Sequence, residues 1–168
     1  MACSIILFRL DLRLADNPAL SAAVKRRGAV IPAFIWSPEE PGTWAMGGAS
    51  SWWLHHSLKK LADSLQRLGS RLIILRGPYL ATLRKLVGAA GADAVYWNRR
   101  YEPDAAKLDH RVEQALLDDG LRVETFNGRL LFEPAETWNQ QGRPFQVFTA
   151  YWRACLKVAE PDRPISSA

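Results

Sequence analysis

The side chains that could bind a charged ligand are gathered in two short segments of the chain. The first is RLDLR at residues 9–13, which follows an apolar run at residues 5–8. The second is NRRYEP at residues 98–103, which follows a run that ends at Trp97. Guanidinium groups pair with carboxylates and phosphates and stack on aromatic rings, so both segments favour a binding site. The alternative is that these arginines and carboxylates pair with each other and only hold the two loops in place.

Several other chemistries are not indicated. There is no GxGxxG or GxxxxGK motif for a nucleotide phosphate, and no GxSxG motif for a nucleophilic serine. His55 and His56 are adjacent rather than four residues apart, and Cys3 and Cys155 lie near opposite ends of the chain. These spacings predict neither a metal site nor a disulfide framework. We therefore expect no metal and no self-sufficient set of catalytic residues.

The elements that must position the two segments alternate along the chain. Apolar runs without polar alternation are typical of buried parallel strands, and the segments between them predict helices that cover both faces of a sheet. The expected strands are residues 4–8, 30–36, 71–76, 93–97 and 121–126. The expected helices are residues 17–27, 49–68, 79–90, 104–119 and one that starts near 147, after a loop at 127–146. The sequence therefore predicts a doubly wound α/β fold with a five-stranded parallel sheet in the order 3-2-1-4-5.

Ligands in such sheets bind beyond the carboxyl ends of the strands, where the strand order reverses. For the predicted order this point lies between the first and fourth strands, so the two polar segments would meet there, near the end of the second strand. The seven tryptophans of the chain are a further reason to consider a planar ligand. The predicted binding residues are Arg9, Asp11, Arg13, Trp36, Asn98, Arg99, Arg100, Tyr101 and Glu102.

The composition is that of a globular protein with one domain. The chain has 168 residues, of which 48% are hydrophobic and 23% charged, and its formal net charge is +5. This mild positive charge would assist association with nucleic acid but does not establish it, because phosphate binding needs the charges on one face. No apolar run approaches the length of a membrane span, and no secretory signal is apparent. We expect a cytoplasmic monomer that does not bind membranes.

Six segments resemble, in order and spacing, the amino-terminal domain of the DNA photolyase and cryptochrome family. They are FRLDLRLADNPAL, GASSWWLHHSLKKL, GSRLIILRG, AVYWNRRYEPDAAKLD, NGRLLFEP and PFQVFTAYWRAC. One motif alone would say little, whereas six in register indicate the family. The resemblance implies an α/β antenna domain over residues 1–157, with residues 158–168 as the start of a linker to a further domain.

The resemblance also implies a function. Photolyases of this family use blue light to repair cyclobutane pyrimidine dimers, and their amino-terminal domain binds a light-harvesting antenna chromophore. That chromophore is methenyltetrahydrofolate or, in some members, a deazaflavin, FMN or FAD. The catalytic FAD and the surface that binds damaged DNA belong to a carboxyl-terminal helical domain. We therefore expect this chain alone to be inactive in repair, and to have that FAD-binding domain of the same protein as its partner.

Some positions depart from the binding motifs of the family. The FRLDLR segment resembles the signature Phe-Arg-Arg-Asp-Leu-Arg, with Leu10 in place of its second arginine. Arg100 occupies a position that is acidic in deazaflavin-binding members, so both differences count against a deazaflavin. Asp104 and Ala105 stand where some folate-binding members have Asn and Glu, which counts against that mode of folate binding. Other members place folate nearer the NRRYEP segment, and folate is therefore the first choice.

Three interpretations of the chain remain open besides the photolyase domain. It could belong to a cryptochrome photoreceptor, or it could be a free-standing α/β module that binds a nucleotide or flavin. It could also be a scaffold with an empty crevice that docks another domain. An exposed apolar patch that includes Phe148, Tyr151 and Trp152 would favour a chain whose surface is normally covered by a further domain.

Overall fold

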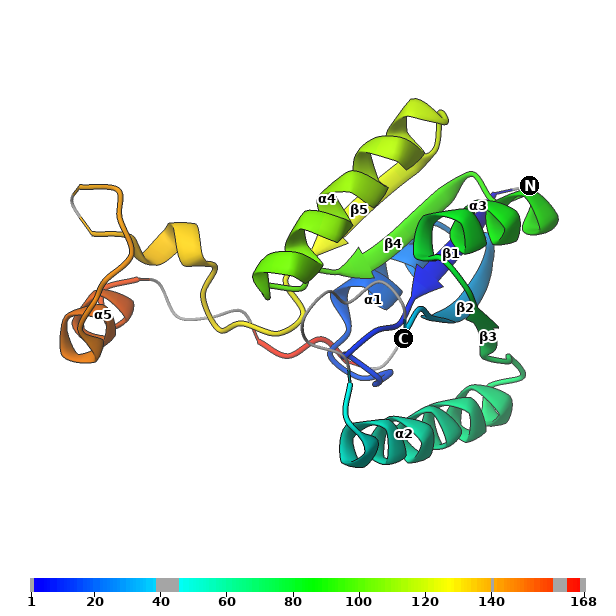
Figure 1. Cartoon of the computed structure of the whole chain (residues 1–168), viewed down its shortest axis with the longest axis horizontal. Coiled ribbons are helices and arrows are strands. Elements are labelled where there is room, and N and C mark those ends of the chain that lie inside the picture. Colours follow the sequence, from blue (N-terminus) through cyan, green and yellow to red (C-terminus); the bar gives the residue numbers. More distant parts are fainter. Residues whose placement is uncertain (1, 39–45, 140, 159–162, 167–168) are drawn as a thin grey trace. The chain divides into compact units, whose positions relative to one another are not determined.

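The computed structural model describes residues 2–38, 46–139, 141–158 and 163–166 (Figure 1). It contains two compact units, of which unit 1 comprises residues 1–128 and 165–168, and unit 2 comprises residues 129–164. Each unit is a group of residues in mutual contact. The domain boundary expected at residue 157 therefore stays a prediction.

A five-stranded parallel sheet forms the centre of unit 1. Its order is β3-β2-β1-β4-β5, which confirms the predicted topology. The central strands β1 and β4 are buried along their whole length, whereas the edge strands β3 and β5 are partly exposed. The continuous burial expected of all five strands therefore holds only at the centre of the sheet. The strands are β1 (Cys3–Leu7), β2 (Ala29–Trp36), β3 (Ile73–Arg76), β4 (Ala94–Asn98) and β5 (Arg122–Phe126).

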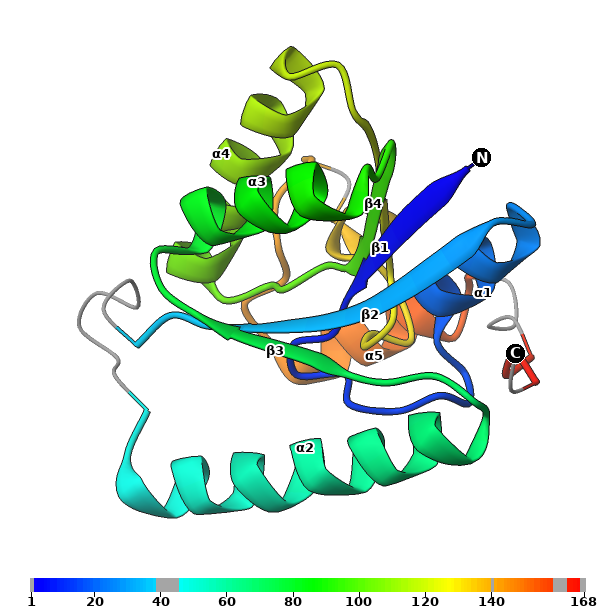
Figure 2. The same ribbon diagram turned by 90° about the vertical axis from the view of Figure 1, so that its right-hand side faces the viewer.

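Helices cover both faces of this sheet, as predicted. Leu83 of α3 and Leu116 of α4 pack against one face, whereas Leu20 of α1 and Leu61 of α2 pack against the other. Figure 2 shows α3 and α4 on one side of the strands and α2 on the opposite side. Within the described ranges, no helix combines the length and the apolar character needed to cross a bilayer. The helices are α1 (Pro18–Lys25), α2 (Gly48–Arg67), α3 (Tyr79–Ala90) and α4 (Pro103–Asp118).

The start of α1 is fixed by its first residues. Asn17 is the N-cap, and its side-chain oxygen accepts a hydrogen bond from the backbone N–H of Leu20 at 3.1 Å. Pro18 occupies the first helical position, where a missing N–H costs nothing. Because β1 ends at Leu7, the loop that carries the first polar segment is held between a buried strand and a capped helix.

Unit 2 contains the short 3-10 helix η1 (Pro134–Thr137) and the helix α5 (Phe148–Cys155). The helix α5 is the one predicted to start near residue 147, whereas η1 lies within a stretch expected to be a loop. An open cavity of about 310 Å³ lies within this unit and is lined mainly by apolar side chains. The lining residues are Leu130, Leu131, Phe132, Pro134, Thr137, Trp138, Pro144, Phe145 and Tyr151.

An ion pair joins the amino ends of the central strands to α1. The guanidinium of Arg26 donates two hydrogen bonds to the carboxylate of Asp93, at 2.7 and 2.6 Å. The same carboxylate accepts the backbone N–H of Cys3 at 3.1 Å. The hydrogen bonds from Arg26 and from the Cys3 backbone hold the pKa of Asp93 well below its ordinary value of 3.8.

This lowered pKa predicts a pH-dependent contribution of Asp93 to stability. Above the ordinary pKa the carboxylate is charged in the folded and unfolded chain, so its pairing stabilises the fold. That stabilisation is lost progressively as the pH falls from this value through the lowered pKa of the folded chain. We expect Asp93→Asn to lower the free energy of unfolding at pH 7 and to flatten its fall between about pH 5 and pH 2. Urea denaturation across this range measures both effects.

The exposed Asp63 of α2 offers a matched control for this measurement. Asp63→Asn is expected to retain the acid dependence of the parent chain. If Asp93→Asn followed the same curve as the parent chain, the ion pair with Arg26 would contribute nothing to the stability of the fold.

Candidate functional site

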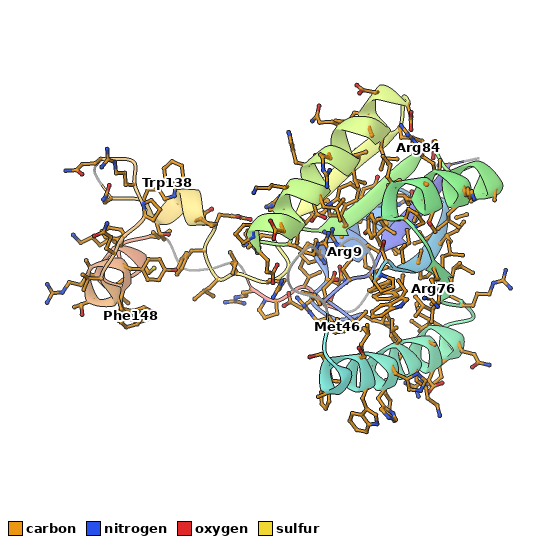
Figure 3. All side chains as sticks on the ribbon, in the orientation of Figure 1. Arg9, Met46, Arg76, Arg84, Trp138 and Phe148 are labelled. Carbon is orange, nitrogen blue, oxygen red and sulfur yellow. The ribbon has the colours of Figure 1, made fainter. Side chains whose placement is uncertain are left out.

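The two polar segments meet at the carboxyl ends of neighbouring strands. β1 pairs with β4 in parallel, from Ser4 opposite Ala94 to Leu7 opposite Trp97. This adjacency confirms the expected reversal of strand order, and it places the segment at 9–13 beside the segment at 98–103. Figure 3 labels Arg9 within unit 1, and this residue follows the end of β1 by two positions.

Asn98 connects these segments to each other and to α1. Its side-chain amide donates hydrogen bonds to a carboxylate oxygen of Asp11 at 2.5 Å and to the side-chain oxygen of Asn17 at 2.8 Å. Its own side-chain oxygen accepts the backbone N–H of Ala19 at 3.2 Å. Asn98 is 2% exposed, so every polar group of this side chain is already bonded inside the protein. The geometry therefore gives Asn98 a positioning role.

Asp11 is also buried and bonded within its own loop. One of its carboxylate oxygens accepts the backbone N–H of Arg9 at 2.9 Å, and the other accepts the amide of Asn98. Ionised carboxylates accept hydrogen bonds strongly, so this arrangement fixes the turn that follows β1. Arg9 and Asn98 are joined a second time, because the Arg9 guanidinium donates to the backbone carbonyl of Asn98.

Two arginines share one buried carboxylate on α4. Arg9 and Arg100 each place a guanidinium nitrogen 2.5 Å from the same oxygen of Asp109. The side chain of Arg9 is buried, and that of Arg100 is partly buried. The guanidinium of Arg9 also lies over the ring of Trp97, 5.6 Å from its centre, and that of Arg100 lies 5.9 Å from the centre of the Tyr79 ring. Among the described residues, the Nε atom of Arg9 has no hydrogen-bond partner. These two cations and one anion carry a net positive charge beside two aromatic rings.

Tyr79 lies beneath this cluster at the first residue of α3. Burial raises the pKa of its phenol above the ordinary value of 10.0, and the neighbouring Arg9 and Arg100 guanidinium groups act in the opposite direction. The phenol is therefore neutral at physiological pH. It adds an aromatic face to the site without adding negative charge.

The other predicted residues lie around this centre. Arg13 donates to the backbone carbonyls of Asp16 and Gly128, and its side chain is 40% exposed. Arg99 donates to the carbonyl and hydroxyl oxygens of Thr125 at 2.8 and 3.2 Å, on the side of β5. Tyr101 is half-buried, and Glu102 is the exposed N-cap residue of α4. These residues form the outer part of the candidate site.

Trp36 lies apart from the arginine cluster. It packs with Phe34, Leu54 and Leu58 in the apolar contact between β2 and α2. The reason is the alternation of side chains along a strand, since Trp36 shares its face of the sheet with Phe34. Arg9 contacts Asp109 and Trp97 on the opposite face. Trp36 is a predicted binding residue, but it therefore lies outside the cluster formed by Arg9, Arg100 and Asp109.

Asp109 is not among the binding residues predicted from the sequence, although the sequence contains a signal for it. Asp109, Val112 and Leu116 are the buried residues of α4, at spacings of three and four residues. A carboxylate at a position of the buried stripe requires a buried partner, and two arginines supply it here. The spacing of Asp109 relative to the apolar residues could therefore have pointed to the site.

A glycine is needed at position 128 because the backbone there lies very close to the side chain of Asn98. A Cβ atom at this position would lie 2.5 Å from the Cγ atom of Asn98, which is too close for any side chain. The chain beyond β5 therefore packs directly over the buried amide that links the two segments.

We expect Asp109→Asn to destabilise the fold by about 3 kcal/mol, because two arginines would lose the charge that compensates them in a buried position. Asp104→Asn is the matched control, since Asp104 lies on the same helix with a side chain that is 62% exposed. Urea denaturation of both variants tests the difference. Equal losses in the two variants would mean that the shared carboxylate does not hold the site together.

Comparison with known proteins places this geometry in a family. A family model described as DNA photolyase matches residues 4–167. The deoxyribodipyrimidine photo-lyase of Agrobacterium fabrum is 46% identical over 160 residues, which cover 95% of this chain and 33% of that protein. Cryptochrome-1 of Arabidopsis thaliana is 44% identical over 165 residues, which cover 97% of this chain and 24% of that protein.

Solved structures of photolyases also match this chain. A bacterial class III photolyase from Agrobacterium tumefaciens matches with a TM-score of 0.92 and 44% identity, covering 99% of this chain and 34% of that chain. An archaeal photolyase from Sulfolobus tokodaii, described with two FAD molecules and as implying a novel light-harvesting cofactor, matches with a TM-score of 0.80 and 27% identity. That match covers 98% of this chain and 36% of the archaeal chain.

This chain thus spans between 24% and 36% of the length of these relatives, while nearly all of its own length is matched in each. The family model extends over almost the whole chain, and the relatives include both photolyases and cryptochromes. The chain belongs to the DNA photolyase family.

Proposed function

We propose that this chain is the light-harvesting domain of a DNA photolyase and binds an antenna chromophore at the edge where β1 and β4 end. The observation that carries this proposal is the cluster in which Arg9 and Arg100 share the carboxylate of Asp109 beside the rings of Trp97 and Tyr79. Its excess positive charge and its aromatic neighbours suit a flat ligand with anionic groups.

Folates and flavins are the chromophore classes that fit this chemistry. Both have a planar ring system, and both have carboxylates or phosphates that an arginine fork can pair with. The S. tokodaii photolyase, described with two FAD molecules, supports a flavin as an alternative to a folate. Within the candidate site, the half-buried Tyr101 and the Arg100 side chain, which is more exposed than that of Arg9, are groups that could contact such a ligand.

Repair of pyrimidine dimers would then require a further domain that holds the catalytic FAD and binds damaged DNA. The coverage of the relatives supports this part of the proposal, since the photolyase of A. fabrum is about three times as long as its match to this chain. The surface of α5 supports it as well. Phe148 is 74% exposed and points away from its helix (Figure 3), and its ring lies parallel to that of Trp152, which is 47% exposed. Tyr151 of the expected patch is half-buried.

Exposed aromatic pairs of this kind are commonly covered by another surface. We propose that the FAD-binding domain of the same protein provides that surface. The corresponding domain of a cryptochrome photoreceptor is the second candidate, because Cryptochrome-1 of A. thaliana is 44% identical over nearly the whole chain. Both candidates include an antenna domain, and they differ in the activity of the complete protein.

We expect the purified chain to bind one of four chromophores in a saturable manner: methenyltetrahydrofolate, FMN, FAD or a deazaflavin. Absorption and fluorescence titrations measure the affinity. Arg100→Ala and Tyr101→Ala are each expected to weaken it about tenfold, as for the loss of a charge-assisted hydrogen bond or a stacking contact. Arg71→Ala is the matched control. Arg71 is exposed and precedes the amino end of β3, whereas the candidate site lies at the carboxyl ends of β1 and β4.

The outcomes of this titration distinguish three cases. Weaker binding only in the Arg100 and Tyr101 variants supports the proposed site. Unchanged affinity in both variants would leave the arginines with the role of holding the loops. The absence of binding for all four chromophores would contradict the antenna function of this chain.

A further inference from the structure

The segment from Arg13 to Asp16 holds two parts of the chain that are distant in sequence. The Arg13 guanidinium donates a hydrogen bond to the backbone carbonyl of Gly128 at 2.7 Å. Asp16 forms two hydrogen bonds with Ile165: its backbone N–H donates to the carbonyl of Ile165 at 2.9 Å, and one of its carboxylate oxygens accepts the N–H of Ile165 at 3.1 Å. Gly128 and Ile165 are the residues of unit 1 that directly precede and directly follow unit 2.

The conformation of Asp16 suits this double contact. Its φ is +50°, which lies in the left-handed region that Asp and Asn adopt more readily than other residues with side chains. In this conformation its N–H and its carboxylate both reach the backbone of Ile165. Its carbonyl accepts two further hydrogen bonds from Arg13, at 3.1 and 2.6 Å. Asp16 therefore uses its donor, its carbonyl and its side chain at once.

We propose that residues 13–16 form a clasp within unit 1 that holds the chain where it leaves this unit, at Gly128, and where it returns, at Ile165. Arg13 holds the departing chain at Gly128, Asp16 holds the returning chain at Ile165, and Arg13 and Asp16 are bonded to each other. Ile165, the first residue of the returning chain, is thereby bonded to the rest of unit 1.

The clasp is continuous with the candidate site. The side chain of Asn17 donates to the carbonyl of Arg13 at 3.0 Å and accepts a hydrogen bond from the side chain of Asn98. Gly128, which the clasp holds, packs against the same Asn98 side chain. A series of hydrogen bonds through Asn17, Arg13 and Asp16 thus links the returning chain to the same buried amide that joins the two polar segments. This inference does not depend on the identity of any ligand.

Amide hydrogen exchange followed by NMR in the full chain tests the clasp directly. Asp16→Asn keeps both the acceptor oxygen and the tolerance for positive φ, and should leave exchange at Ile165 within about twofold of the parent. Asp16→Gly keeps the backbone conformation but removes the acceptor. It should speed exchange at Ile165 about fivefold, the size expected for the net contribution of one hydrogen bond. Asp16→Ala should speed exchange at both Ile165 and residue 16.

If residues 13–16 act together, a substitution of Arg13 should also affect amide exchange at Ile165. Arg13→Ala removes the bonds to the Asp16 carbonyl, and it should speed exchange at Ile165 about as much as Asp16→Gly does. Asp63→Ala, at an exposed position of α2, is the control and should change nothing. Amides of β1 and β4 report in every variant whether unit 1 is still folded.

Two results would overturn the proposal. The first is exchange at Ile165 in the parent chain at the rate of an unstructured peptide. The second is unchanged exchange at Ile165 in Arg13→Ala or in Asp16→Ala while the amides of β1 and β4 stay protected.

Discussion

Strand β1 lies beside β4, and the buried side chain of Asn98 bonds the ends of both strands to the start of α1. This interaction is the one on which the other features depend. Parallel strands have their carboxyl ends at the same edge of a sheet, so the pairing brings two polar loops together. The hydrogen bonds of Asn98 then fix the distance between the loops. The arginine cluster and the clasp at residues 13–16 are both built on this fixed edge.

The arginine cluster combines stability with an unbalanced charge. Asp109 compensates part of the charge of Arg9 and Arg100, which allows both guanidinium groups to be buried or partly buried. Asp109 carries one negative charge and the two guanidinium groups carry two positive charges, so these three residues keep one positive charge next to the rings of Trp97 and Tyr79. The two interpretations of these arginines, as loop supports and as ligand contacts, are therefore compatible. Arg9 is the more deeply buried of the two, and Arg100 lies nearer to solvent.

Much of this arrangement could be predicted from the sequence, because it depends on local patterns. Apolar runs identify the strands, and the strand order then places the two polar segments together. Contacts that join distant elements were not predictable in the same way. The role of Asp109 depends on how α4 packs against the sheet, and the position of Trp36 depends on which face of β2 it occupies. The link between Asp16 and Ile165 spans nearly the whole chain, and no local pattern specifies it.

A crystal structure of the chain with its reconstituted chromophore is the most direct test of the proposed binding site. We expect the chromophore to lie beyond the ends of β1 and β4, with a polar atom within hydrogen-bonding distance of Arg100 or Tyr101. An ordered chromophore elsewhere, such as in the apolar cavity of unit 2 between Leu130 and Tyr151, would contradict it. In that case the shared carboxylate and its two arginines would be a structural feature of the sheet edge and not a binding site.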